Sequence, residues 1–262
     1  MSANASIAPG TASVGSVLLG TAISVSTVPG LSANLLVMVA LVHGGLLTKP
    51  EKTIYRAIFN LLICDTFQLC NIAAIAGAAQ DILVPQKFYR LPGLLFLWNW
   101  QTAWFLLSFI ALNRYALACW PGRALFLSSQ RGVNLLMGGV WLASAATLSV
   151  SQYFLPCCRF VVMPAVYTVS WLRKEGEPLW SDWLVEWPGN TATTTIIILC
   201  YSAIIVQYRV TNRQIAQCLV AKALAKRRRK ELRLAVQFMV ISAIFIACTV
   251  IFRLFPLIPS LR

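Results

Sequence analysis

Histidine and charged residues are scarce in this sequence. Of its 262 residues, 11% are charged and one is a histidine, His43, whereas an average soluble protein has about 25% charged residues. No Ser/His/Asp set can form without His43, and no pair among the eight cysteines has the spacing of metal ligands. A glycine-rich phosphate loop is also missing. These absences argue against an enzyme, a bound metal ion and a cofactor.

Long apolar runs fill the chain instead. Hydrophobic residues make up 58% of it, in blocks long enough for the roughly 20-residue helix that crosses a bilayer. The blocks lack the period-two alternation of membrane-barrel strands. The sequence therefore predicts an all-α, polytopic transmembrane helix bundle with six helices, at Val17–Val42, Ile54–Gln80, Leu91–Trp120, Val133–Leu155, Thr191–Tyr208 and Leu232–Phe255.

Lysine and arginine are distributed unevenly between the two ends of these blocks. Fifteen of the 22 fall in the loops on one side, including the basic run from Lys222 to Arg233, and such an excess marks the cytoplasmic side. We therefore expect a multi-pass protein of the plasma membrane with its N-terminus outside. Asn4, in an Asn-Ala-Ser sequon, is then a candidate glycosylation site. The basic run is expected to contact anionic membrane lipids rather than nucleic acid.

Polar or amphipathic side chains interrupt the apolar blocks at Asn34, Asn60, Asp65 and Trp141. A carboxylate in hydrocarbon is costly, so Asp65 is expected to face other helices, with Asn34 or Asn60 as its partner. Two roles fit it: a hydrogen-bonded knot between helices, or a coupling-ion or conformational role. Trp141 lies well inside its block, so we expect it to pack between helices rather than at the membrane interface.

Small residues beside these positions predict close helix packing. Ser32 and Ala33 precede Asn34 in the first block. The fourth block offers a second set around its tryptophan: Gly138, Gly139, Ala143 and Ala145.

The triplet Asn113-Arg114-Tyr115 lies near the end of the third block, within SFIALNRYALACWP. Taken alone, Arg114 is explained as an arginine that snorkels to the inner membrane surface. Asn34, Asp65, this triplet and Trp141 nevertheless occur in order on successive blocks, and in that order they resemble the landmarks of a rhodopsin-like G-protein-coupled receptor. The resemblance implies that Arg114 holds the inner face closed at rest. It also implies that Arg114, flanked by Asn113 and Tyr115, joins the G-protein cleft on activation.

More narrowly, the chain is similar to nematode serpentine chemoreceptors of class x or class t. The stretches that carry this resemblance are YRAIFNLLICDTFQLCNIAAIAG, LSFIALNRY, WPGNTATTTIIILCYSAIIVQYR and KRRRKELRLAVQFMVISAIF. An asparagine in place of an acid before the arginine also fits this branch. The resemblance implies a chemosensory receptor that binds an external small molecule and activates a heterotrimeric G protein.

The chain departs from the family pattern in its cysteines. The family has a cysteine at the outer end of the third helix, but counting back from Arg114 leads to Tyr89 and its neighbours, where no cysteine lies. Cys157 and Cys158, in the second outer loop, therefore lack an evident disulfide partner.

A second departure concerns the C-terminal part. The sixth block contains no tryptophan before Pro256. No seventh apolar block and no Asn-Pro-x-x-Tyr motif follow Pro256. We therefore expect residues 1–262 to form a seven-transmembrane receptor domain that is incomplete at its C-terminus. The alternatives are a nonsignalling six-helix fragment or pseudogene product, and a transporter or channel subunit.

Aromatic residues recur along the outer half of the third block. Counting back by helical turns from Arg114 places Trp104, Trp100 and Phe96 near one face. Together with Gln101 they are candidate ligand contacts, and the alternative is that they only pack between helices.

Overall fold

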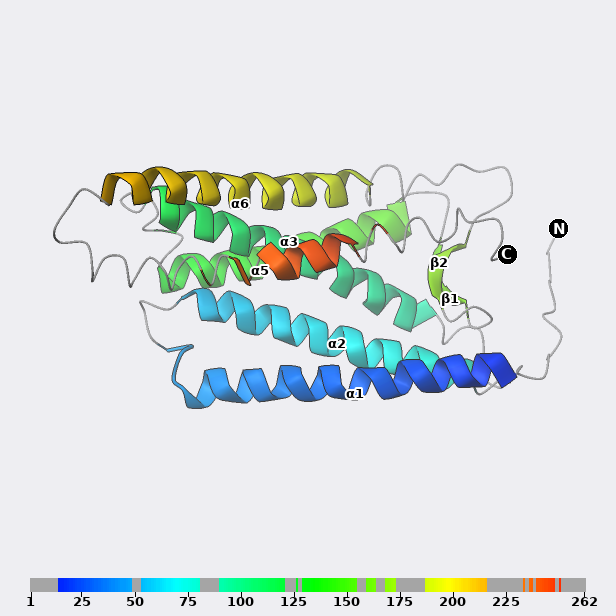
Figure 1. The fold of residues 1–262 in the computed structure, drawn as a ribbon. Helices are drawn as coiled ribbons and strands as arrows, with labels where there is room; N and C mark the ends of the chain where they lie inside the picture. Colours follow the sequence, from blue (N-terminus) through cyan, green and yellow to red (C-terminus); the bar gives the residue numbers. More distant parts are fainter. Residues whose placement is uncertain are drawn as a thin grey trace.

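Long α-helices lying side by side make up the fold (Figure 1). The computed structural model describes residues 14–48, 53–80, 90–120, 126, 129–154, 159–163, 168–172, 187–215, 233, 236–237, 239–247 and 250. The helices in these ranges are α1 (Val14–His43), α2 (Ile54–Gln80), α3 (Arg90–Cys119), α5 (Gln130–Ser149) and α6 (Trp187–Ile215). Residues 239–247, from the last apolar block, are also helical. The all-α bundle predicted from the sequence is confirmed.

Five helices in the described part of the chain are long and apolar enough to cross a membrane. They differ sharply in burial, since 67% of the α3 span is buried against 11% of the α1 span. Large apolar side chains such as Leu36 and Leu142 are exposed on the outside of the bundle. Exposed apolar residues on the perimeter fit a hydrocarbon environment, so α3 forms the centre and the other helices present their outer faces to lipid.

The helix bounds follow the apolar blocks closely in some places and not in others. Helix α2 has the bounds that its block predicts, whereas α6 extends beyond its predicted block, Thr191–Tyr208, at both ends. Pro188 lies in the first turn of α6, where proline is well tolerated. At the other end, polar residues continue the helix as far as Ile215. Apolarity marks where a helix crosses the membrane rather than where it ends.

A β-hairpin and a π-helical turn lie between α5 and α6, and the sequence did not predict either. The π-helix η3 (Val150–Phe154) continues α5. The strands β1 (Arg159–Met163) and β2 (Thr168–Leu172) pair antiparallel, with Val161 opposite Ser170. Figure 1 shows the hairpin at the end of the bundle where α1 and α3 begin, and β1 contacts α3. The hairpin therefore covers the end of the bundle that the charge bias assigns to the outside.

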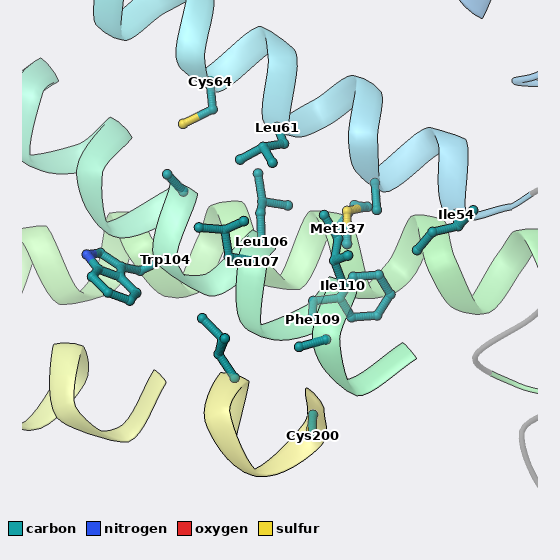
Figure 2. Packing of buried hydrophobic residues seen from close by; sticks show 14 of the residues in the cluster. Ile54, Leu61, Cys64, Trp104, Leu106, Leu107, Phe109, Ile110, Met137 and Cys200 are labelled. Atoms are coloured by element: carbon teal, nitrogen blue, oxygen red, sulfur yellow. The ribbon is translucent and has the colours of Figure 1, made fainter. Parts of the chain in front are cut away.

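The core is centred on α3 (Figure 2). Leu106 and Ile110 of α3 have no exposed surface. Helices α2, α5 and α6 contribute buried side chains around them, among which Leu61 and Cys64 come from α2, Met137 from α5 and Cys200 from α6. The side chains that position the site described below are therefore held by the best-packed helix of the bundle.

Close helix packing occurs at other positions than the small residues predicted. Ser32 and Ala33 are exposed, whereas Gly30, one turn before Asn34, faces α2, where a Cβ atom would lie 3.0 Å from the Leu69 side chain. The helical repeat explains part of the difference, since residues 30 and 34 lie one turn apart on the same face, whereas residue 32 points to the other side of the helix.

The small residues of α5 also point outward. Gly138 and Gly139 are exposed, and a Cβ atom at either would meet no other atom within 4 Å. Ala143 is exposed and Ala145 is half-buried, whereas the fully buried small residue of this region is Ser144. The predicted tight packing at the two glycines is therefore wrong within the described bundle.

The loop after α1, at the end of the bundle that the charge bias assigns to the inside, is tied to two helices by an arginine and a glutamine. Arg56 of α2 donates from Nε to the Leu47 carbonyl at 2.8 Å and from Nη1 to Oδ1 of Asn134 on α5 at 3.0 Å. Gln130, the first residue of α5, donates to the Thr48 carbonyl at 3.1 Å. We call this set of contacts the inner clasp. It holds the inner ends of α2 and α5 and the loop after α1 together.

The start of α5 gives a prediction that contrasts two glycines. Ser129 caps the helix by accepting from the Gly132 amide at 3.0 Å, and a Cβ atom on Gly132 would collide with the Phe126 carbonyl and approach Ser129 Oγ at 2.9 Å. We expect Gly132→Ala to destabilise the protein by about 1–3 kcal/mol, as overpacking does. Gly138→Ala meets open space and should be neutral or stabilising by up to about 1 kcal/mol, because alanine favours the helix. Thermal unfolding of the two purified variants checks this, and equal melting temperatures would contradict the account.

Candidate functional site

Asn60 and Trp141 form a polar contact between α2 and α5. The Trp141 indole Nε1 donates to Asn60 Oδ1 at 3.2 Å, and Asn60 Nδ2 donates to the Arg56 carbonyl one turn earlier at 2.9 Å. The Trp141 ring meets Trp98 of α3 edge to face, with ring centroids 5.5 Å apart. Trp141 thus packs between three helices, and one asparagine side chain has both its donor and its acceptor engaged.

Asp65 lies half-buried on α2. Among the described residues, no hydrogen bond joins it to Asn34 or Asn60, so the expected pairing is wrong for this structure. Two physical reasons account for this. Five residues along a helix turn a side chain by about 140°, which places Asn60 and Asp65 on different faces, and the Asn60 amide already bonds elsewhere. The polar knot of the bundle is therefore built on Asn60 and Trp141 rather than on Asp65.

The triplet at the inner end of α3 places its three side chains differently. Asn113 is fully buried, and Arg114 and Tyr115 are half-buried. The Arg114 charge acts on the hydroxyl of Tyr201 on α6. The Tyr115 ring packs at 5.9 Å from Trp120, just beyond the end of α3. Arg114 therefore faces across the bundle toward α6 instead of lying wholly in solvent.

Two residues at this inner site were missed by the sequence analysis. Tyr201 is 4% exposed and Ser242, from the last apolar block, is 1% exposed. Within the described residues, neither the Tyr201 hydroxyl nor the Ser242 hydroxyl has a hydrogen-bond partner. A hydroxyl group in the middle of each apolar block was the available signal, but nothing in the two blocks indicates that these hydroxyls are buried.

Hydroxyl groups also connect α3 to its neighbours at mid-height. Thr102 of α3 and Ser144 of α5 are both fully buried and their hydroxyl oxygens are 2.7 Å apart. Ser108 of α3 donates to its own helix and approaches the Thr193 carbonyl of α6 at 3.5 Å. Such contacts fix the neighbours of α3, because a polar group in hydrocarbon needs a partner.

The candidate ligand residues of α3 form an aromatic set with one residue of the last apolar block. Phe96 stacks on Trp100 with ring centroids 6.1 Å apart, and Trp100 stacks on Phe245 at 5.0 Å. Phe245 also meets Trp104 edge to face at 4.9 Å. The three aromatic residues of α3 thus face one side of the helix, and Phe245, absent from the sequence analysis, joins them to the last block.

Gln101 and Trp104 are buried with polar atoms that lack hydrogen bonds. Their exposed fractions are 6% and 2%. Within the described residues, neither Gln101 Oε1 nor Trp104 Nε1 has a hydrogen-bond partner. Buried polar atoms are rarely left without a hydrogen-bond partner. The outer half of α3 therefore offers both an acceptor and a donor for hydrogen bonds.

Some predicted positions lie outside the described residues: Asn4, Cys157, Cys158 and most of the basic run from Lys222 to Arg233. In the part of the chain that the structure describes, no group of three or more His, Cys, Asp or Glu side chains could hold a metal ion.

The comparison with protein families gives one match over most of the chain. A family model described as serpentine type 7TM GPCR chemoreceptor Srx matches residues 24–260. Of the two classes that the sequence resembles, class x is therefore confirmed.

Individual proteins give weaker likenesses. The somatostatin receptors type 3 of Mus musculus and Rattus norvegicus are each 27% identical to the chain, over 94% and 91% of it. The chain spans 60% and 56% of the length of these curated relatives. Squid rhodopsin superposes with a TM-score of 0.66 at 16% identity, covering 88% of this chain and 64% of its own. The last likeness shows the rhodopsin-like fold alone.

Proposed function

Because the chain belongs to the Srx family of serpentine 7TM G-protein-coupled chemoreceptors, we propose that it binds an external small molecule and activates a heterotrimeric G protein. The family places the chain among multi-pass membrane receptors rather than enzymes. In the proposal, the ligand contacts the outer half of α3, at Phe96, Trp100, Gln101 and Trp104. The G protein contacts the inner end of the same helix, at Asn113, Arg114 and Tyr115.

The position of Arg114 supports the proposal best. The residue lies near the end of a buried helix, on the side with the lysine and arginine excess, and no acid flanks it in the sequence. Its charge acts on Tyr201 across the bundle. A half-buried arginine near the end of a helix has a long, flexible side chain that can keep its charged head in water. It is then available to an incoming partner.

The packing of α3 supports a connection between the two ends. Trp100 and Trp104 both contact Phe245 of the last apolar block, and Ser242 lies one turn away near Tyr201. A ligand that displaces Trp100 would displace Phe245, and through its helix Ser242. Ligand binding would thereby shift the equilibrium between closed and open inner faces.

Nucleotide exchange on the G protein tests the proposed function. Membranes that carry the full-length receptor should increase GTPγS binding to at least one Gα subtype when a panel of small organic compounds is added. The control is membranes from cells without the receptor. Exchange at the control level for every Gα subtype would contradict the proposal.

The same proposal places the receptor in the plasma membrane with its N-terminus outside and Asn4 available for glycosylation. An epitope attached to the N-terminus should then be detected by antibody on intact cells. The reason is that the charge bias puts the loops rich in lysine and arginine inside, and the N-terminus lies on the opposite side. A matching epitope inserted between Lys226 and Lys230 should require permeabilisation. Detection of the N-terminal epitope only after permeabilisation would reverse the topology.

A further inference from the structure

Two atoms on one face of α3 form an unused donor and acceptor pair. Gln101 Oε1 accepts hydrogen bonds and Trp104 Nε1 donates them, and neither has a partner in the described part of the bundle. Residues three apart on a helix are neighbours, with Cβ atoms about 5–6 Å apart. Gln101 and Trp104 are therefore neighbouring side chains on α3.

The chemistry of this pair selects a particular kind of group. A hydroxyl or an amide can donate to Gln101 Oε1 and accept from Trp104 Nε1 at the same time. An ammonium can only donate and would face the indole N–H, whereas a carboxylate can only accept and would face the amide oxygen. We propose that the ligand is an uncharged molecule that carries a hydroxyl or amide on an aromatic body. This inference rests on the proposed function, because it takes the outer half of α3 as the ligand site.

The distribution of charge favours the same conclusion. Residues 91–113, 132–154, 187–208 and 239–247 contain no Asp, Glu, Lys, Arg or His. Asp65, on α2, is the one acidic residue among those that the structure describes. A charged ligand beside Gln101 would lose its hydration without gaining a counter-ion from any of these four stretches, and such desolvation is costly.

The neighbouring aromatic rings favour an aromatic body. Phe96 and Trp100 are stacked and half-buried, and Gln101 follows Trp100 directly. Aromatic rings favour other rings as neighbours, by stacking or edge contact, so an aromatic body matches these surroundings. The polar pair would then orient the ligand, and the rings would supply most of its buried surface.

Four compounds with one skeleton test the proposal: 2-phenylethanol, 2-phenylethylamine, phenylacetate and ethylbenzene. Binding to the purified full-length receptor in lipid nanodiscs is measured by the shift of its thermal unfolding, without a G protein. We expect the alcohol to bind about tenfold more tightly than ethylbenzene, as one or two added hydrogen bonds allow. The amine and the carboxylate should bind at least about tenfold more weakly than the alcohol, because each loses one bond and its hydration.

Two variants assign this preference to the polar pair. Gln101→Leu and Trp104→Phe should each bring the alcohol and ethylbenzene to similar affinities. Gln101→Leu should fold at least as well as the wild type, because it removes an unpaired buried acceptor. Gln207→Leu makes the same change in an exposed side chain near the inner end of α6 and should retain the preference.

Several results would overturn the proposal. These are tight binding of the amine or the carboxylate, an alcohol preference that survives Gln101→Leu, or the absence of binding by all four compounds. The nucleotide-exchange assay is scored separately. Selective binding of the alcohol without exchange would support this inference and contradict the proposed function, whereas exchange without the predicted order of binding would do the reverse. Should either variant fail to fold, the wild-type order of the four compounds still decides.

Discussion

Arg114→Ala is expected to abolish G-protein activation while surface expression stays largely intact. Arg114 is half-buried near the end of α3, and alanine is the best helix former, so the substitution should not unfold the helix. A guanidinium at the centre of a protein interface often contributes about 2 kcal/mol or more to binding, which corresponds to roughly a 30-fold loss of affinity. GTPγS exchange, normalised to the receptor at the cell surface, measures the effect.

Two further variants show whether a loss of G-protein activation is specific to the Arg114 guanidinium. Arg131→Ala removes an exposed arginine at the start of α5 and controls for charge on the inner face. Arg114→Lys keeps the charge but loses the planar set of donors, so an intermediate activity is expected. If Arg114→Ala still activates the G protein at normal expression, the residue is only a snorkelled anchor, and the receptor mechanism loses its main support.

Trp104→Ala is expected to destabilise the protein more than Gly132→Ala does. Trp104 is 2% exposed at the centre of the best-buried helix and meets Phe245 edge to face. Truncation of a buried tryptophan costs about 3–5 kcal/mol, because it removes contacts and leaves a cavity. The thermal unfolding temperature and the fraction of receptor that reaches the surface should both fall.

Trp187 provides the matching control. It begins α6, and half of its surface is exposed. Trp187→Ala should therefore change the unfolding temperature much less than Trp104→Ala. Similar effects at the two positions would show that Trp104 is not held in a packed interior.

The crossings of the membrane were predictable because each depends on a continuous segment. About 20 apolar residues suffice to specify a transmembrane helix, and α2 begins and ends where its block predicts, at Ile54 and Gln80. The hairpin β1–β2 was not predictable in this way. Its two strands are rich in Val, Phe, Thr and Trp, but their pairing depends on contacts that no local pattern contains.

The candidate site shows the same division. The position of Trp141 inside its block correctly implied packing between helices, and its partner Asn60 was among the polar residues chosen from the sequence. The pairing of Asp65 with Asn60 was wrong, because residues five apart on one helix lie on different faces. Phe245 and Tyr201 gain their importance only from contacts with α3, and the sequence of their own blocks contains no trace of these contacts.

The inner clasp has a consequence for the order in which the chain is made. Arg56 and Asn134 are 78 residues apart, whereas Arg56 and the Leu47 carbonyl are only nine apart. When α2 leaves the ribosome, Arg56 can therefore bond at once to the loop that has just preceded it. Its second partner exists only after α3 and the start of α5 have been synthesised. The first two helices can thus enter the membrane as a hairpin whose inner turn is already fixed. Helix α5 then docks when Asn134 accepts a hydrogen bond from Arg56, which the earlier contact has already positioned.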